Sequence, residues 1–408
     1  MAWRISRQGR LERLIVFLGK EARPVGELLF QGAGKVRTSL FRYARSWLED
    51  ADRRPLYPIE LPLRAKAKDS TPFELPLPLY DAAPDGWGRS VLEAAYPVQT
   101  FGMGEFLAAA GDNRTGELRF GSEPFEAPEI WVPAQPNIVL PDGSETLEDL
   151  VLAAEAVDAG RPTGHHLKLL LRASADTGGA RPKAHLRHRN GEWIAKFKAW
   201  GDGFDNPRVE AACLSLAGAC GIETPPHELL EVAGRSVLLV SRFDRNGSER
   251  LGYMSATTLT KVPPSTYATT WSYADVATAA REAGILPCEA ELFRRMLFNC
   301  RIHNTDDHLR NHAFIRDRAG WRLSPVFDIV PNNQATMVLR PARDIAPTAD
   351  INMAFAAWPK FLLNRELATA IRDEVEQGMR KLPEVFDQFE ITARDRETLA
   401  PLLSARAA

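Results

Sequence analysis

The sequence predicts an α+β fold, with a strand-rich first half and a largely helical C-terminal part. Two observations support this class. The stretch "RLIVFLGKEARPVGELLF", residues 13–30, has two apolar runs separated by a polar turn, which is typical of a β-hairpin. From Ser272 onward helical patterns dominate. They are interrupted by "HNTDDHLRN" (303–311) and "WRLSPVFDIVPN" (321–332).

Length and composition indicate a globular protein of more than one domain. The chain has 408 residues, 45% of them hydrophobic and 25% charged. A net charge of -2 gives no global basic field for nucleic acid. The four cysteines have no CxxC spacing, which favours a reduced, cytoplasmic setting. No apolar run approaches the roughly 18 residues of a membrane helix, so we expect no membrane association.

Four regions follow from changes in pattern along the chain. Residues 1–121 read as a mixed α/β subdomain, with helices at 90–96 and 102–111 and a short strand at 116–120. Residues 122–145 carry five prolines and are the linker candidate. Residues 146–245 begin with a helix whose Thr146 and Asp149 form a capping box. Residues 246–408 are the helical region. The segment before Glu12 remains unassigned.

The third region reads as strands followed by a helix. Strands are predicted at residues 166–174, 184–190, 192–200 and 235–245. The helix at 206–221 has apolar residues at helical spacing from Val209 to Cys220. Residues 175–183, "ADTGGARPK", lie between the first two predicted strands; we call them the glycine loop.

The polar cluster at 303–311 contains a spacing that protein kinases use for catalysis. Asp306 and Asn311 form D-x-x-x-x-N, in which the aspartate accepts the proton of the substrate hydroxyl and the asparagine holds magnesium. Asp307 is the rival base, but it lies only four residues from Asn311. The alternative interpretation is a polar turn between helices, because the pattern is common by chance.

Other residues could complete a phosphate and metal site. Asp328 sits between apolar residues, where a carboxylate needs a partner or a metal, although it could also cap a turn. Lys196, in "WIAKFKAW", is the predicted ATP lysine; Lys198 on the same strand face is the rival. Glu210, near the start of the next helix, is its predicted partner. The alternatives are an edge-strand lysine and a favourable helix-start carboxylate.

The glycine loop and the strand at 235–245 supply the remaining parts of this pattern. Gly178 and Gly179 allow backbone N–H groups to approach phosphate closely, although a simple hairpin turn would also explain them. Ser241 to Phe243 follow an apolar strand, where a kinase hinge exposes backbone groups to adenine. Each signal alone is weak, but together they occur in kinase order.

The chain resembles the HipA-like serine/threonine kinases, toxins of type II toxin–antitoxin pairs. The resemblance rests on "LIVFLGKEARPVGELLF", "RYARSWL", "DAAPDGWGRSVL", "GDNRTGELRF", "GGARPKA", "NTDDHLRN" and "LSPVFDIVP", which span nearly the whole chain. It implies a two-lobed protein-kinase-like fold of HipA type, with an N-terminal mixed α/β subdomain and a helical C-terminal lobe. It also implies an ATP- and Mg²⁺-dependent serine/threonine kinase.

The resemblance also implies roles for individual residues. Asp306 matches the catalytic base, and Asn311 and Asp328 match the magnesium ligands. The residues matched to nucleotide binding are Gly178, Gly179, Ala180, Arg181, Lys183, Lys196, Ser241, Arg242, Phe243 and His308. Family members can autophosphorylate a serine just before the phosphate loop. Ser174 is nearest here and Thr177 could substitute, but the spacing to the glycines departs from the expected pattern.

The implied partner is a small DNA-binding, HipB-like antitoxin, through which any DNA contact would be indirect. Family substrates include aminoacyl-tRNA synthetases, but this sequence names no target. Two alternatives remain open. One is a metal-dependent hydrolase using His303, Asp306, Asp307 and His308. The other is a catalytically inactive kinase-like scaffold that binds an antitoxin–DNA complex.

Overall fold

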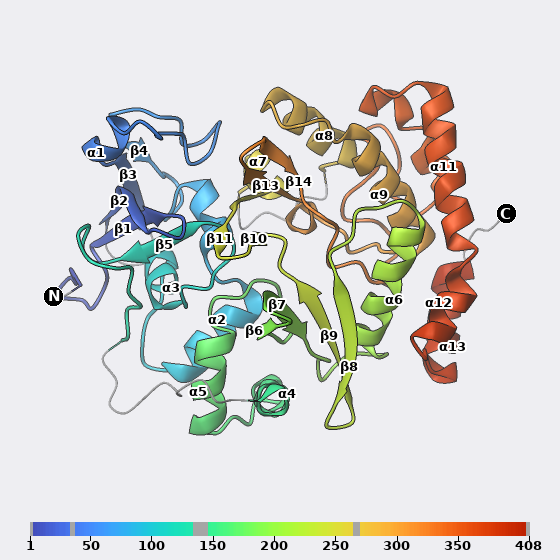
Figure 1. Cartoon of the computed structure of the whole chain (residues 1–408), viewed down its shortest axis with the longest axis horizontal. Coiled ribbons are helices and arrows are strands. Elements are labelled where there is room, and N and C mark those ends of the chain that lie inside the picture. Colours follow the sequence, from blue (N-terminus) through green and yellow to red (C-terminus); the bar gives the residue numbers. More distant parts are fainter. Residues whose placement is uncertain (1–2, 33–36, 134–145, 264–269, 405–408) are drawn as a thin grey trace. The chain divides into compact units, whose positions relative to one another are not determined.

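The computed structural model describes residues 3–32, 37–133, 146–263 and 270–404. They form two compact units: residues 1–200 with 244–254, and residues 201–243 with 255–408. The predicted linker, 122–145, falls in the first unit's sequence range, and its residues 134–145 lie outside the described residues. Figure 1 shows the elements of each unit, coloured along the chain.

The first unit is built on an antiparallel sheet with the strand order β4-β3-β2-β1-β5. The hairpin expected near the N-terminus is confirmed as its centre: β1 (Arg13–Leu18) pairs with β2 (Arg23–Gln31). Leu14, Val16 and Leu28 are fully buried beneath it. The outer strands are β3 (Thr38–Tyr43), β4 (Lys68–Asp69) and β5 (Leu118–Gly121).

Helices and two short hairpins complete the first unit. The helices are α1 (Arg45–Leu48), η1 (Leu77–Ala82), α2 (Gly86–Ala95), α3 (Met103–Ala109), α4 (Leu147–Asp158) and α5 (Gly164–Ala173). The predicted Thr146–Asp149 capping box is present at the start of α4, which packs against α5. The hairpins are β6 (Lys183–His188) with β7 (Gly191–Lys196), and β10 (Arg245–Asn246) with β11 (Glu249–Arg250). β12 (Gly252–Ser255) follows.

The strand predicted at residues 166–174 is wrong, because this segment is the helix α5. Five of its residues, "LKLLL", form a short apolar run that periodicity alone cannot assign to strand or helix. Leucine, lysine and arginine are strong helix formers, and Thr163 with His166 forms a capping box at the start. The glycine loop therefore joins a helix to a strand, and it is not the turn of a hairpin.

The second unit is mainly helical, as predicted. It contains α6 (Asn206–Ala219), which packs on the hairpin of β8 (His227–Val232) and β9 (Arg235–Ser241). β13 (Ala313–Asp317) and β14 (Gly320–Leu323) form a second hairpin. The remaining helices are α7 (Ala256–Leu259), α8 (Tyr273–Glu282), α9 (Glu289–Arg301), η2 (Leu309–Asn311), α10 (Ile351–Phe355), η3 (Trp358–Phe361), α11 (Arg365–Met379), α12 (Leu382–Gln388) and α13 (Ala393–Ser404).

The central helix of the second unit is α9, which packs against α10 and, as Figure 1 shows, against α8 and α11. Its residues Leu292, Phe293, Met296 and Leu297 are fully buried. All four cysteines of the chain are buried and free. Among the described residues, no helix combines the length and the apolar character needed to cross a bilayer.

Candidate functional site

Asp306 and Asp307 are neighbours in the loop after α9, but they occupy opposite environments. Asp306 is exposed, and its Oδ1 accepts a hydrogen bond from Nε2 of Gln334 at 3.3 Å. Asp307 is only 2% exposed. The loop therefore offers the carboxylate of Asp306 to an incoming molecule and withholds that of Asp307.

The buried carboxylate of Asp307 is the centre of a hydrogen-bond network. Its Oδ2 accepts from the hydroxyl of Tyr273, from Nδ2 of Asn299 at 3.0 Å and from Nε2 of His312 at 2.8 Å. Burial acts to raise the pKa of Asp307, but the attraction of His312 and the hydrogen bonds of His312 and Tyr273 outweigh it and lower the pKa. Asp307 is therefore a charged structural group that fixes the loop.

The same loop is braced by residues that follow Asp328. His303 adopts a left-handed backbone with φ of 54°. Its Nδ1 lies 2.7 Å from the backbone oxygen of Asn332, and its own carbonyl accepts from the N–H of Asn332 at 2.9 Å. Thr305 also donates to the Asn332 carbonyl, at 3.2 Å. Such bracing holds the Asp306 backbone in place.

The four residues of the alternative metal-dependent hydrolase lie in different surroundings. Within the described part of the chain, no three His, Cys, Asp or Glu residues are grouped so that they could hold a metal ion. Two of the four proposed ligands already form other hydrogen bonds. His303 is hydrogen-bonded to the backbone oxygen of Asn332. Asp307 accepts hydrogen bonds from Tyr273, Asn299 and His312. His308 is half-buried and precedes η2.

Asn311 and Asp328 flank the hairpin of β13 and β14. Phe314 pairs with Leu323, and the N–H of Ser324 donates to the carbonyl of Ala313 at 2.8 Å. Asn311 precedes this paired segment and Asp328 follows it, so both emerge from the open end of one hairpin. Asn311 is 7% exposed and Asp328 is half-buried. Their oxygen atoms are of the hard type that Mg²⁺ prefers.

The backbone of Asp328 is held by Glu210. Asp328 has φ of 61°, a left-handed conformation that is uncommon outside glycine and often marks functional sites. Its N–H donates to Oε1 of Glu210 at 3.2 Å, and this glutamate is buried in α6. The sequence predicted Glu210 as the partner of Lys196; the structure adds its hydrogen bond to Asp328.

The predicted hinge residues lie at the end of β9. The N–H of Ser241 donates to the carbonyl of Pro226 at 2.8 Å, and Arg242 is buried. The ring of Phe243 lies 5.4 Å, centre to centre, from that of Phe327. Because Phe327 immediately precedes Asp328, this ring contact links the hinge segment to the backbone of the predicted metal ligand.

In the first unit, the glycine loop has an exposed tip and a buried lysine at its end. Gly178, Ala180 and Arg181 are exposed, whereas Lys183 is 9% exposed. Gly179 has φ of 76°, and a Cβ at this position would lie 2.6 Å from Nζ of Lys183. The lysine ammonium therefore lies against the glycine backbone, and the positive φ of Gly179 disfavours any residue with a Cβ.

Two lysines lie opposite each other on the hairpin that follows the loop. Lys183 of β6 pairs with Lys196 of β7, so their side chains leave the same face. Lys196 is half-buried, while the rival Lys198 is exposed and lies beyond the strand. Two lysine side chains are therefore placed on one face of this hairpin.

Ser174 and Thr177 are both buried, with their hydroxyls engaged. Ser174 is 0% exposed, and its Oγ donates to the carbonyl of Lys183 at 2.7 Å. The hydroxyl of Thr177 donates to the carbonyl of Ser174 at 2.8 Å. In this conformation neither hydroxyl is accessible to a phosphate donor.

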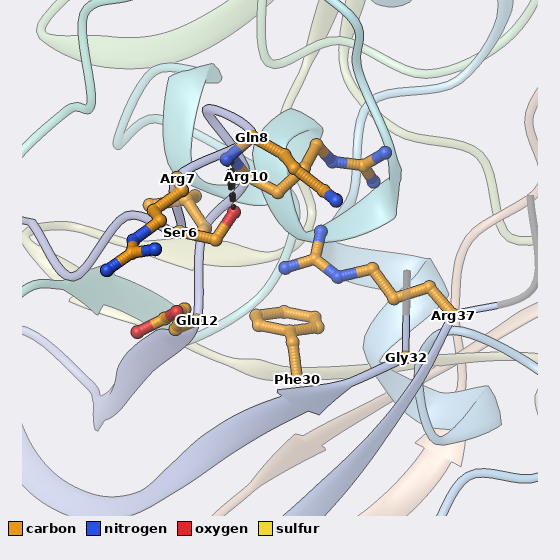
Figure 2. A pocket seen from close by; sticks show the side chains of 9 residues that line it. Ser6, Arg7, Gln8, Arg10, Glu12, Phe30, Gly32 and Arg37 are labelled. Carbon is orange, nitrogen blue, oxygen red and sulfur yellow. Dashed lines mark hydrogen bonds between the residues drawn. The ribbon is translucent and has the colours of Figure 1, made fainter. Parts of the chain in front are cut away.

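A pocket of about 310 Å³ in the first unit shares no residue with the predicted site. Figure 2 shows Arg7, Arg10 and Arg37 around the ring of Phe30. The segment before β1, unassigned from sequence, forms part of its wall. Two of its arginines already have acidic partners: Arg10 and Arg37 both bind the fully buried Glu105. This arrangement explains how residues 5–11 are anchored, since Glu105 also accepts the N–H of Leu11.

Two family models match successive segments of the chain. Residues 14–121 match the model of the HipA N-terminal domain, and residues 175–385 match that of the HipA-like C-terminal domain. The fold is of HipA type. The chain belongs to the HipA family.

Individual relatives are distant but cover most of the chain. Y4mE of Sinorhizobium fredii, described as a candidate kinase, is 24% identical in an alignment of 400 positions that covers 87% of this chain and 89% of that protein. Among solved structures, HipA of Shewanella oneidensis, in a toxin–antitoxin complex with HipB and operator DNA, matches with a TM-score of 0.66 and 16% identity. That match covers 96% of this chain and 95% of the solved one.

The structure also reveals residues that sequence reasoning missed. Tyr273, Asn299 and His312 come from α8, α9 and the segment after η2, so their convergence on Asp307 has no local sequence signal. Gln334, which contacts Asp306, likewise lies 28 residues away.

Proposed function

We propose that this chain is an ATP- and Mg²⁺-dependent serine/threonine kinase and the toxin of a toxin–antitoxin pair. The observation that carries the proposal is the contrast between Asp306 and Asp307. An exposed carboxylate on a loop fixed by a buried charged network is suited to receive a proton from a substrate hydroxyl. Asp307 is less suited to this role, because its side chain is 2% exposed and its Oδ2 already accepts three hydrogen bonds.

In this mechanism Asp306 orients the serine or threonine hydroxyl and accepts its proton. The hydroxyl oxygen forms a bond to the γ-phosphorus of ATP, the bond from that phosphorus to the β,γ-bridging oxygen breaks, and ADP leaves. Asn311 and Asp328 would hold Mg²⁺, which when bound supplies positive charge to the phosphate oxygens. Glu210 keeps Asp328 in its left-handed conformation.

The residues matched to the phosphate loop and the ATP lysine would hold the triphosphate. Lys183 and Lys196 present two positive charges on one face of a hairpin. Gly178, Gly179, Ala180 and Arg181 would surround the phosphates with N–H groups and a guanidinium. Ser241, Arg242 and Phe243 would contact the adenine, and His308 would lie in the nucleotide site, as the family resemblance implies.

We further propose a small DNA-binding antitoxin as partner, with DNA contacted through it. The solved Shewanella oneidensis complex of HipA, HipB and operator DNA supports this partner class. The substrate would be a cellular protein with a serine or threonine acceptor, for which an aminoacyl-tRNA synthetase is a candidate. The four free thiols agree with a cytoplasmic setting.

Phosphate transfer from γ-labelled ATP tests the proposal. The purified chain is incubated with Mg²⁺ and labelled ATP, alone and with cell lysate, and labelled sites are mapped by mass spectrometry. Label on a serine or threonine that disappears with Asp306→Ala supports the kinase. Equal labelling by the variant would refute the role of Asp306. ATP binding without any transfer would favour an inactive scaffold.

A further inference from the structure

The start of α2 contacts the glycine loop about 90 residues further along the chain. The N–H of Trp87 donates to the carbonyl of Gly179 at 2.7 Å, and the N–H of Asp85 lies 3.4 Å from the carbonyl of Thr177. The indole Nε1 of Trp87, which is buried, donates to the carbonyl of Lys183 at 3.0 Å. Residues 85–88 thus engage carbonyl groups along the whole glycine loop.

Two glycines make this close approach possible. A Cβ on Gly88 would lie 2.5 Å from the carbonyl oxygen of Thr177, and a Cβ on Gly86 would lie 2.6 Å from that of Gly179. Contacts this short are not found for real side chains, so the backbone of α2 must lie directly against the loop. The family resemblance rests partly on this "DGWGR" stretch, for which the proposed mechanism has no role.

These contacts determine which way the loop's donors face. In a planar trans peptide the C=O and the following N–H point in opposite directions. Because the carbonyls of Thr177 and Gly179 face α2, the N–H groups of Gly178 and Ala180 face away from it. Neither N–H is hydrogen-bonded within the described part of the chain, and both residues are exposed. Outward-facing N–H groups in a glycine turn form an anion-binding concavity.

We propose that residues 85–88 are a positioning element that holds the glycine loop with the N–H groups of Gly178 and Ala180 turned toward the nucleotide phosphates. This inference rests on the proposed function, because it assigns the phosphates to the glycine loop. It adds that α2 of the N-terminal subdomain, through Trp87 and Gly88, determines how tightly those phosphates are held.

Gly88→Ala tests this role with little disturbance of α2. Alanine favours a helix more than glycine does, and Gly88 has no positive φ, so the helix should form normally. The added methyl group, however, would lie 2.5 Å from the backbone oxygen of Thr177, so the loop must move away. The matched control is Gly164→Ala in α5, where a Cβ meets no atom within 4 Å.

Binding of Mg-ADP and of adenosine to each variant is measured by calorimetry. We expect Gly88→Ala to weaken Mg-ADP binding about tenfold to a hundredfold, which corresponds to the loss of one or more charge-assisted hydrogen bonds. Adenosine carries no phosphate, so its binding should be unchanged. Gly164→Ala should bind both as the wild type does. Trp87→Phe, which keeps a buried ring and loses the indole donor, should weaken Mg-ADP binding by a smaller factor.

Hydrogen exchange gives a readout that does not depend on nucleotide. Amides of residues 176–183 should exchange faster in Gly88→Ala than in Gly164→Ala. If wild type binds Mg-ADP and Gly88→Ala matches Gly164→Ala in both measurements, the positioning role is refuted while the proposed function stands. If the wild-type chain binds no Mg-ADP, the proposed function fails and the positioning role fails with it.

Discussion

The backbone N–H of Asp328 donates a hydrogen bond to the side-chain carboxylate of Glu210, across 3.2 Å. The two residues are 118 positions apart in sequence. Asp328 has a left-handed backbone and Glu210 is 3% exposed, so a buried acceptor stabilises an unusual conformation. Glu210 therefore helps to position the carboxylate of Asp328, in addition to any interaction that it makes with a lysine.

Replacing Glu210 separates these two roles. Glu210→Ala removes the acceptor for the N–H of Asp328. A hydrogen bond to a charged group contributes roughly 1.5–3 kcal/mol, so we expect the Mg²⁺ concentration needed for half-maximal ATP binding to rise about tenfold. Glu210→Gln keeps a carbonyl oxygen and should stay close to wild type. A magnesium titration at fixed ATP measures both. Equal loss in the two variants would show that the charge of Glu210 matters rather than its hydrogen bond to Asp328.

Stability should distinguish the two adjacent aspartates. Asp307→Ala leaves Tyr273, Asn299 and His312 without their common buried acceptor, and we expect a loss of about 3–5 kcal/mol in the free energy of unfolding. Asp306→Ala is the matched control, because a substitution at an exposed side chain is usually within about 0.5 kcal/mol. Chemical denaturation of both variants measures the difference. Similar stability for the two would contradict the structural role of Asp307.

The sequence predicted some elements well because their signals are local. The β1–β2 hairpin and the capping box of α4 depend on neighbouring residues, and both are present. The helix α5 was missed because a short apolar run fits strand and helix equally. The spacing of D-x-x-x-x-N favoured Asp306 over Asp307, but only the fold shows that Asp307 is buried.

The contacts that position the candidate site could not be predicted from sequence. The hydrogen bond from Trp87 to Gly179 and the network around Asp307 join residues from separate elements. Tertiary packing decides such contacts, and no local propensity encodes them. Spacing therefore indicates which residue types are available, and the fold decides which of them face solvent.

Acid should weaken the fold partly through Asp307. Its pKa in the folded protein is below the usual value of 3.8, so the unfolded chain binds more protons in that range. The stabilisation from its charge is therefore present above about pH 5 and is lost as the pH falls through the folded pKa. We expect the stability difference between wild type and Asp307→Asn to be constant from about pH 7 to pH 5 and to shrink from about pH 5 to pH 3. Urea denaturation across this range measures it, and a constant difference would contradict the assignment.

Ser174 provides a test of how a negative charge affects the glycine loop. Its buried hydroxyl donates to the carbonyl of Lys183, which also accepts from Trp87. An aspartate cannot donate there, and its charge would face a carbonyl oxygen in a site without solvent. We expect Ser174→Asp to displace the loop, to speed hydrogen exchange at residues 176–183 and to weaken Mg-ADP binding about tenfold or more.

Two controls separate the effect of charge from that of the lost hydrogen bond. Ser174→Ala removes only the hydrogen bond and should cost about 1 kcal/mol of stability. Thr100→Asp adds a charge at an exposed position in the loop after α2 and should leave Mg-ADP binding unchanged. Unaltered exchange and binding in Ser174→Asp would mean that the loop tolerates a buried charge. Phosphorylation of Ser174 would then not inactivate the protein through a displaced loop. If the loop is displaced in Ser174→Asp, phosphorylation of Ser174 could inactivate the protein in the same way, because the modified side chain could no longer occupy its site beside Lys183.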